Sequence, residues 1–154
     1  MALSQWLYIS DAVDPVCLDD LLRIQDVAMR NNARQNITGL LLHCEGRFVH
    51  FLEGDYASVS ELYSRISTDD RHANITLLYD RPAGGRIFEE WHLAMLDLDL
   101  HGEAERSDLR AMVEYAGNSD ADFEGQPRDL RILGRFADLL SSDGVTASDT
   151  GGLR

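Results

Sequence analysis

The chain has 154 residues, of which 44% are hydrophobic, and a formal net charge of -13 at pH 7. This length suits one domain with one core, and the acidic balance argues against nucleic acids and acidic membranes as partners, because binding them requires neutralising phosphates. The sequence also lacks a signal peptide and any run approaching the roughly 20 apolar residues of a membrane span, so we expect a cytoplasmic protein.

The first two predicted elements are a strand and a helix. Residues Ser4–Ser10 are aromatic and β-branched enough for a short strand. Asp14 followed by Pro15 predicts a helix start, an N-cap and then a first-turn proline. An apolar stripe continues to Asn31 or Asn32, where asparagine tolerates the left-handed conformation that ends many helices.

A β-hairpin is predicted next. The apolar segments Ile37–Cys44 and Arg47–Glu53 flank Glu45-Gly46, a turn whose glycine can take positive φ. Three further segments follow, a helix and two strands: Asp55–Ser67, Asn74–Tyr79 and Trp91–Leu98. The order β-α-β-β-α-β-β is typical of the ferredoxin-like group of α+β folds.

Strand parity predicts that the mixed sheet is covered on both faces. Both alternating sets of residues in the hairpin strands are apolar, as in sheets that are buried on each side. Two C-terminal helices, Glu103–Tyr115 and Arg128–Leu140, joined by the polar loop Asn118–Gln126, would cover the second face. We therefore expect a core over 1–100, a C-terminal helical cap over 101–141 and a disordered tail over 142–154.

One residue does not fit its surroundings. His50 lies in an otherwise apolar strand, on the same face as Phe48 and Leu52, and a titratable group there needs a partner or costs stability. Cys17 and Cys44 lack metal-binding spacing, and we expect free thiols. We interpret three other histidines as isolated polar positions: His43, His92 and His101. No phosphate-binding glycine motif, metal-ligand spacing or nucleophile set appears, so an enzyme is not expected.

Five segments together resemble the BLUF family, the flavin-binding blue-light sensors. They are LYIS at 7–10, NNARQNITGLLL at 31–42, GRFVHFLEG at 46–54, DDRH at 69–72 and FEEWHL at 88–93. The similarity runs in order over about residues 3–98. It implies a ferredoxin-like domain that holds FAD between its first two helices. In the family, light moves an electron and then a proton from a tyrosine to the flavin, and a glutamine amide between them rearranges.

The resemblance assigns roles to individual residues. Tyr8 falls on the electron-donating tyrosine, and Asn32 on the asparagine that hydrogen-bonds the flavin ring, with Asn31 and Arg34 flanking it near the cofactor. A second group falls near the ribityl and phosphate portion: Arg65, Asp69, Arg71 and His72. From the residues alone, Tyr8 would be interpreted as an aromatic core residue and the DDRH segment could be a polar loop. Asn32 could be a helix C-cap, a role compatible with binding the flavin because it uses different atoms.

Two positions depart from the family pattern. His50 replaces the switching glutamine, and Leu93 replaces a common methionine, while Trp91 is kept. A neutral imidazole has one donor and one acceptor nitrogen, so it could bridge Tyr8 and the flavin, but it cannot reverse both roles as an amide can. We therefore expect an altered photocycle whose response depends on pH, since imidazole has an ordinary pKa of about 6.5.

Two interpretations of the function remain open. A light sensor of this kind would signal through protein contacts, as a homo-oligomer and with a separate effector protein. Alternatively, His50 is a satisfied core histidine and the chain is a light-insensitive interaction or oligomerisation module that retains the fold.

Overall fold

A computed structural model describes residues 2–116 and 128–142 of the chain. Five strands form one sheet in the order β4-β1-β3-β2-β5, in which β2 and β5 are parallel and the other neighbours antiparallel. The elements are β1 (Leu3–Ala12), α1 (Leu18–Arg34), β2 (Thr38–Cys44), β3 (Arg47–Asp55), α2 (Tyr56–Ser67), β4 (His72–Pro82), β5 (Ala94–Asp97), the short 3-10 helix η1 (Leu98–Leu100), α3 (Glu103–Ala116) and α4 (Arg128–Ser142). The predicted ferredoxin-like α+β fold is confirmed.

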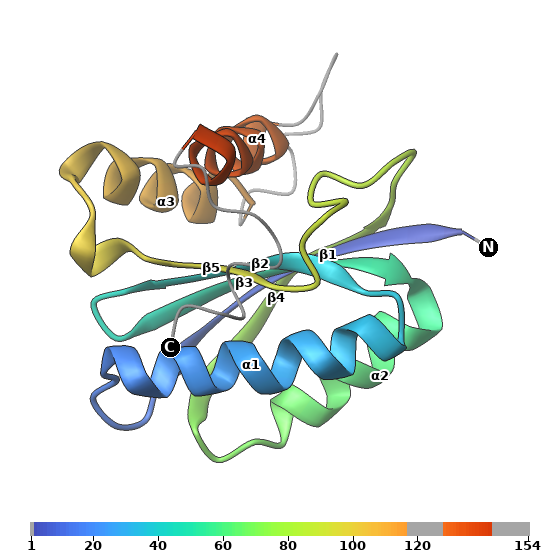
Figure 1. Cartoon of the computed structure of the whole chain (residues 1–154), viewed down its shortest axis with the longest axis horizontal. Coiled ribbons are helices and arrows are strands. Elements are labelled where there is room, and N and C mark those ends of the chain that lie inside the picture. The colour runs from blue at the N-terminus through green and yellow to red at the C-terminus, as the bar shows by residue number, and fades with distance from the viewer. Residues whose placement is uncertain (1, 117–127, 143–154) are drawn as a thin grey trace.

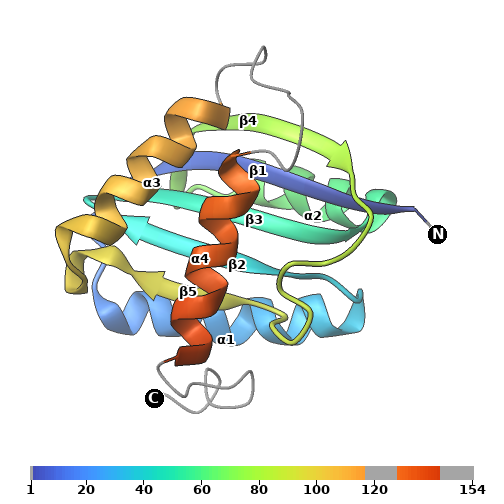
Figure 2. The ribbon, with the colours of Figure 1, turned by 90° about the horizontal axis from the view of Figure 1, so that it is seen from above.

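Helices cover both faces of the sheet, as the apolar residues on both faces of the hairpin strands predict. Helices α1 and α2 lie below the sheet in Figure 1 and α3 and α4 above it. Seen from above, α4 runs across the strands (Figure 2). Its Leu133 and Phe136 belong to the same buried cluster as Leu40 and Phe51 of the sheet. The alternate strand residues instead form two clusters on the α1 and α2 side.

The hairpin places His50 at the centre of the sheet. Its turn residues Glu45 and Gly46 both have positive φ, 51° and 78°, which suits the tight turn between twisted strands. In the register that follows, His50 lies opposite Tyr8 of β1 on one side and Leu41 of β2 on the other. The predicted hairpin is therefore confirmed.

The start of α1 differs from the prediction. The helix begins at Leu18, with Cys17 rather than Asp14 as its N-cap. The reason is local, because the Asp20 carboxylate accepts the backbone N–H of Cys17 at 3.1 Å, which satisfies one free donor of the helix start. Asp14 and Pro15 remain in the preceding loop.

The end of α1 also lies later than predicted. The helix continues through Asn31 and Asn32 to Arg34, and the residue with left-handed φ, 54°, is Asn36. The Asn32 side chain is used elsewhere, donating to the carbonyl of His92 at 2.8 Å. An asparagine does take the left-handed conformation after this helix, but it is Asn36, four residues after Asn32.

The remaining differences concern the ends of strands. Strands β1 and β4 are longer than predicted and β5 is shorter, because Trp91–Leu93 form a bend instead of a strand. The predicted loop Asn118–Gln126 lies outside the described residues, as does the predicted tail apart from Ser142, which ends α4. Among the described helices, none combines the length and apolar character needed to cross a membrane.

Candidate functional site

A cavity of about 570 Å³ opens between α1, α2 and the sheet. This volume lies in the range of small-molecule sites. Its walls are apolar residues of the two helices: Ile24, Val27, Ala28, Leu62 and Ile66. Its floor consists of side chains of the sheet and of the segment before β5: Tyr8, Leu41, Phe48, His50 and Leu93. Val27 is 52% exposed, so one wall offers apolar surface that a planar ligand would cover.

Tyr8 and His50 form a hydrogen-bonded pair in the cavity floor. The Tyr8 hydroxyl contacts Nδ1 of His50, and Tyr63 packs edge-on against Tyr8 at 5.2 Å between ring centroids. Burial, and secondarily Tyr63, raises the pKa of Tyr8 well above its ordinary value. Burial, and secondarily His72, lowers the pKa of His50 to about 3. Both groups are therefore neutral at pH 7.

These protonation states fix the direction of the bond. A neutral Tyr8 hydroxyl must place its proton somewhere, and Nδ1 of His50 is its acceptor within the described part of the chain. His50 then carries its own proton on Nε2. That nitrogen is buried and has no hydrogen-bond partner among the described residues. A buried donor without an acceptor is costly, so this atom is where a bound ligand would complete the site.

Two side chains of α1 hold the segment that leads into β5. Asn32 donates to the carbonyl of His92 at 2.8 Å, and Gln25 to that of Leu93 at 3.1 Å. Leu93 is fully buried in the cavity floor. Trp91, two residues earlier, instead belongs to the buried cluster under α4 on the opposite face. The bend between them thus connects the cavity with the second face of the sheet.

Each of the two arginines that line the cavity is paired with a carboxylate. Arg23 lies 2.7 Å from the carboxylate of Asp20, and Arg71 lies 2.6 Å from that of Asp69. Hydrogen bonds from Arg71 lower the pKa of Asp69 to about 2. His72 contacts the Ser10 hydroxyl at 3.1 Å, and burial lowers the pKa of this histidine.

Most of the residues predicted from the sequence meet at this cavity. Those that line it are Tyr8, Asn31, Asn32, His50, Asp69, Arg71, His72 and Leu93. Arg34, Arg65 and Trp91 do not line it. Arg65 lies on α2 between Leu62 and Ile66, but its side chain is exposed. Arg34 is exposed in the last turn of α1.

The sequence analysis missed much of the α1 wall and the loop before it. Gln25, Asp20 and Arg23 received no role, although the last two line the cavity. Stepping back from Asn31 by three or four residues leads through Val27 and Ile24 to Asp20. This helical period could have identified that face.

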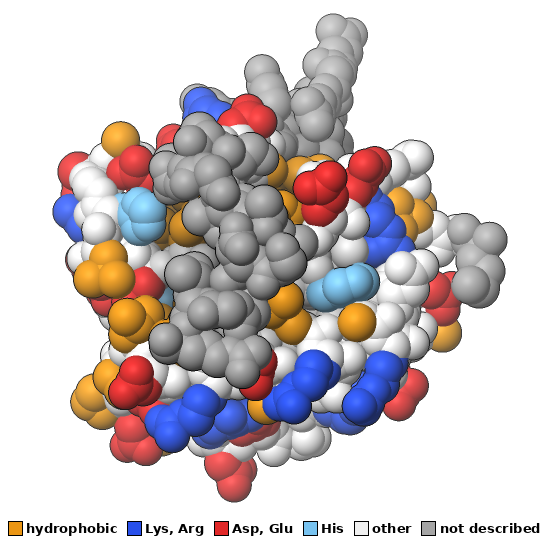
Figure 3. Space-filling model, viewed as in Figure 1, with side chains coloured by type: hydrophobic (Ala, Val, Ile, Leu, Met, Phe, Trp, Pro, Cys, Tyr) orange, Lys and Arg blue, Asp and Glu red, His pale blue; other side chains and the backbone are white. Residues whose placement is uncertain are grey.

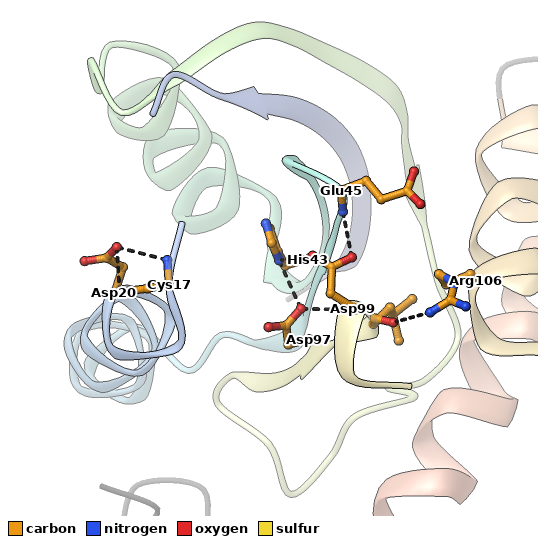
Figure 4. Close-up of polar contacts among 8 residues, drawn as sticks. Cys17, Asp20, His43, Glu45, Asp97, Asp99 and Arg106 are labelled. Carbon is orange, nitrogen blue, oxygen red and sulfur yellow. Dashed lines mark hydrogen bonds and ion pairs between the residues drawn. The ribbon is translucent and has the colours of Figure 1, made fainter. Parts of the chain in front are cut away.

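A separate polar cluster joins the β2–β3 turn to η1 (Figure 4). His43, Asp97 and Asp99 offer ligand atoms within 4.8 Å of one another, so His43 is not isolated as predicted. His43 contacts Asp97 at 3.1 Å, Asp97 accepts the backbone N–H of Asp99 at 3.2 Å, and Asp99 accepts that of Glu45 at 3.0 Å. These bonds explain why the three residues lie together: they join two segments of the chain outside the cavity.

Comparisons with known proteins identify the family of this chain. A model of the BLUF family, described as sensors of blue-light using FAD, matches residues 3–94. Photoactivated adenylate cyclase subunit beta of Euglena gracilis is 44% identical over 92 residues, which are 59% of this chain and 11% of that protein. Its beta-like protein FB from the same organism is 41% identical over 99 residues, 64% of this chain and 12% of that protein. The chain therefore spans about a tenth of the length of these relatives.

Solved structures share the fold over most of the chain. The dark-state structure of BlrB, a BLUF protein, has a TM-score of 0.67 at 28% identity and covers 90% of this chain and 98% of its own. A bacterial light-regulated adenylyl cyclase has a TM-score of 0.66 at 28% identity, over 94% of this chain and 40% of that one. Because the family model matches more than half of the residues, the chain belongs to the BLUF family of blue-light sensors that use FAD.

Proposed function

We propose that this BLUF domain binds its flavin in the cavity between α1 and α2, and that His50 alters its response to light. The observation that supports this most directly is the Tyr8–His50 hydrogen bond beside Nε2 of His50, which has no hydrogen-bond partner in the described part of the chain. The oxidised flavin ring brings hydrogen-bond acceptors and absorbs blue light. In this proposal the other contacts come from Asn31, Asn32 and the Asp69 to His72 segment.

The His50 ring allows fewer arrangements than a glutamine amide. An amide can rotate and exchange its oxygen for its NH2 group, whereas rotating the imidazole would put a carbon in place of Nδ1 and lose the Tyr8 bond. Moving the proton from Nε2 to Nδ1 would require Tyr8 to donate to a new acceptor. The described residues offer none to its hydroxyl besides His50. His50 therefore holds one hydrogen-bond arrangement, and we expect no long-lived switched state.

The experiment compares dark and blue-lit absorption spectra of the wild-type chain, His50→Gln and the control His101→Gln, a histidine that does not line the cavity. The wild type and the control should be yellow, release flavin on denaturation and show no persistent red shift. His50→Gln should show one. A colourless protein would contradict flavin binding, and a persistent wild-type shift equal to that of His50→Gln would contradict the role of His50.

The structure also changes the expected pH dependence. An exposed imidazole has a pKa of about 6.5. Burial lowers the pKa of His50 to about 3. The imidazole therefore stays neutral across the physiological range, and the spectra should not change between mildly acidic and alkaline buffer. The light response of the folded protein is therefore expected to be independent of pH, in contrast to what an exposed imidazole would give.

The proposal includes a path by which a change at the flavin would leave the cavity. We expect the bend from Leu93 to Trp91 to carry any change to the second face of the sheet, and from there to a separate effector or a second copy of the chain. Size-exclusion chromatography of the same dark and lit samples separates this from the alternative, a light-insensitive interaction module. In the alternative, association is the same in both samples and in flavin-free protein.

A further inference from the structure

Four aromatic side chains form a row from the cavity floor to the surface of the protein. The ring centroids of Tyr8 and Tyr63 are 5.2 Å apart. Those of Tyr63 and Trp6 are 5.5 Å apart, and those of Trp6 and Tyr56 are 5.3 Å apart. These are the separations of packed aromatic pairs. Because Tyr8 lines the cavity and Tyr56 is 53% exposed, this aromatic row joins the cavity to solvent.

Two elements supply the aromatic row, each through its own period. Trp6 and Tyr8 alternate with Leu7 on β1 and belong to the buried cluster on the α2 side of the sheet. Tyr56 and Tyr63 lie one heptad apart on α2, so they share one face of the helix. Among the residues of the row only Tyr8 lines the cavity, so flavin binding does not explain the other three.

The side chains of the aromatic row suit the movement of single electrons. Tyrosine and tryptophan lose an electron more readily than most side chains, because an aromatic ring spreads the positive charge and the unpaired electron. Electron transfer slows steeply with distance, so several steps between packed rings are faster than one long step. The family resemblance makes Tyr8 the residue that gives an electron to the flavin in light. The row then offers further electron donors behind Tyr8.

The surface end of the aromatic row has a proton acceptor. The Tyr56 hydroxyl donates to the Asp80 carboxylate at 3.4 Å. A tyrosine that loses an electron becomes a strong acid, and a carboxylate beside it takes up the proton. The Nε1–H group of Trp6 donates instead to the Ser4 hydroxyl at 2.8 Å, which is a poor base, so Trp6 keeps its proton. Loss of the Tyr56 proton therefore traps the electron vacancy at the surface.

We propose that the aromatic row conducts electrons inward, so that a one-electron reductant in solution, such as ascorbate, replaces the electron that light removes from Tyr8. This inference rests on the proposed function, because it requires a bound flavin as the electron acceptor. It adds an activity to that function, the light-driven transfer of electrons from a reductant in solution to the flavin. The Tyr8 proton stays within the hydrogen bond to His50 and is not consumed.

The steps along the aromatic row conserve electrons and protons. One electron moves from Tyr63 to Tyr8, one from Trp6 to Tyr63 and one from Tyr56 to Trp6, while the Tyr56 proton passes to Asp80. Ascorbate then gives an electron to Tyr56, and the proton returns from Asp80. In sum, one electron passes from ascorbate to the bound flavin, and the four aromatic side chains are restored.

A reductant could also reach the cavity directly, without the aromatic row. Basic side chains gather along α1 on the face seen in Figure 3, and Val27 of this helix lines the cavity and is 52% exposed. An anion such as ascorbate is attracted to that face. At the end of the row, Asp55 precedes Tyr56 and Asp80 contacts it, which disfavours an anion. The experiment therefore has to remove this bias and change the row itself.

The flavin-loaded full chain is illuminated with blue light, without oxygen and with ascorbate, and the rate at which flavin absorption is lost is measured. The buffer contains about 1 M salt, at which the Debye length is about 3 Å, so neither face of the protein attracts ascorbate from a distance. The wild type should lose its flavin absorption under these conditions.

Variants of the aromatic row should slow this loss. Tyr63→Phe and Tyr56→Phe each keep a packed ring but make it hard to oxidise, and each should slow the loss at least about tenfold, which corresponds to a barrier about 1.4 kcal/mol higher. Asp80→Asn, which removes the proton acceptor, should slow it as well. The control is Tyr79→Phe, at a tyrosine that packs against the cluster on the α4 side of the sheet, and its rate should equal that of the wild type. Neither Tyr63 nor Tyr56 lines the cavity, so the flavin content per chain should not change.

A second measurement locates the electron vacancy on the protein. The chain is illuminated in air without ascorbate, so that oxygen takes the electron from the flavin, and a nitroso spin trap captures the radical that remains on the chain. Mass spectrometry of the digested protein should find the adduct on Tyr56 in the wild type and in Tyr79→Phe. The adduct should be absent from Tyr56 in Tyr63→Phe and in flavin-free samples.

The outcomes separate this inference from the proposed function. Equal rates of loss in the wild type, Tyr63→Phe and Tyr56→Phe would overturn the inference while flavin binding stands, because the reductant then reaches the flavin directly. An adduct on Tyr56 that persists in Tyr63→Phe would overturn it too, as would a wild type that keeps its flavin absorption under light and ascorbate. A chain that binds no flavin would overturn the inference together with the proposed function.

Discussion

At the scale of single residues, His50 shows how a polar group is tolerated inside a sheet. Its Nδ1 is satisfied by Tyr8, and its ring remains neutral because burial lowers its pKa to about 3. In the unfolded chain the same imidazole has a pKa of about 6.5. Between these two values the unfolded state binds a proton that the folded state does not, so stability falls as the pH falls.

This difference predicts the pH dependence of stability. Between pH 6.5 and pH 5 the wild type should lose about 1.6 kcal/mol more of its free energy of unfolding than His50→Gln, because the slope rises from half its maximum at pH 6.5 towards about 1.4 kcal/mol per pH unit. Urea denaturation of both proteins at several pH values measures it. Above pH 7 the two curves should run parallel. If they also run parallel down to pH 5, the folded imidazole takes up its proton as easily as the unfolded one.

At the scale of elements, Glu53 fastens the connection between β4 and β5 to the sheet. Its fully buried carboxylate accepts the backbone N–H groups of Ile87 and Phe88 at 2.7 and 2.8 Å and the Gln5 amide at 3.0 Å. Burial raises its pKa, and the bonds from Ile87 and Phe88 oppose that shift. This connection ends in the bend before β5, so Glu53 helps position Leu93 in the cavity floor.

Replacing this acceptor predicts a loss of stability. Glu53→Gln puts an NH2 donor against groups that are themselves donors, which should cost about 1–3 kcal/mol and increase hydrogen exchange at the amides of residues 87 and 88. Glu61→Gln, the same change at an exposed position of α2, should alter neither. Protection at both amides equal to the wild type would show that something else holds the connection.

What the sequence could predict follows from the range of the interactions. The hairpin depends on parity and on Glu45-Gly46, which are local, and the Tyr8–His50 pair follows once that hairpin joins β1. The C-terminal end of α1 and the Trp91–Leu93 bend depend on distant partners. Gly39 donates to the carbonyl of Trp91 at 3.0 Å, and Asn32 reaches sixty residues along the chain to that of His92.

The same distinction applies to the candidate site. The family resemblance placed Arg71 near the ribityl and phosphate portion of the ligand, yet the Arg71 side chain pairs with Asp69 two residues away. The resemblance was enough to place the segment at the cavity, but not to determine which partner the Arg71 charge would take. Alternative ion pairs of an exposed arginine differ little in free energy, so no pattern along the chain predicts which one forms.

At the scale of the whole molecule, the two faces of the sheet form two layers that share the same strands. Cavity residues such as Tyr8 and His50 alternate along β1 and β3 with residues of the cluster under α4, such as Leu7 and Phe51. We propose that the helices over 101–141 are therefore part of one cooperative domain with the core over 1–100. A loss of packing on one face of the sheet would then destabilise the cavity on the other face.

A matched pair of leucines tests this coupling. Leu133 of α4 is fully buried, whereas Leu100 is 71% exposed. Leu133→Ala should cost about 2–5 kcal/mol and Leu100→Ala less than about 0.5 kcal/mol, measured by urea denaturation. Helical signal and bound flavin should be lost in one transition in each protein, because no strand can unfold while its other face stays packed. A Leu133→Ala protein that loses helix at low urea and keeps its flavin would show instead that the cap folds separately from the light-sensing layer.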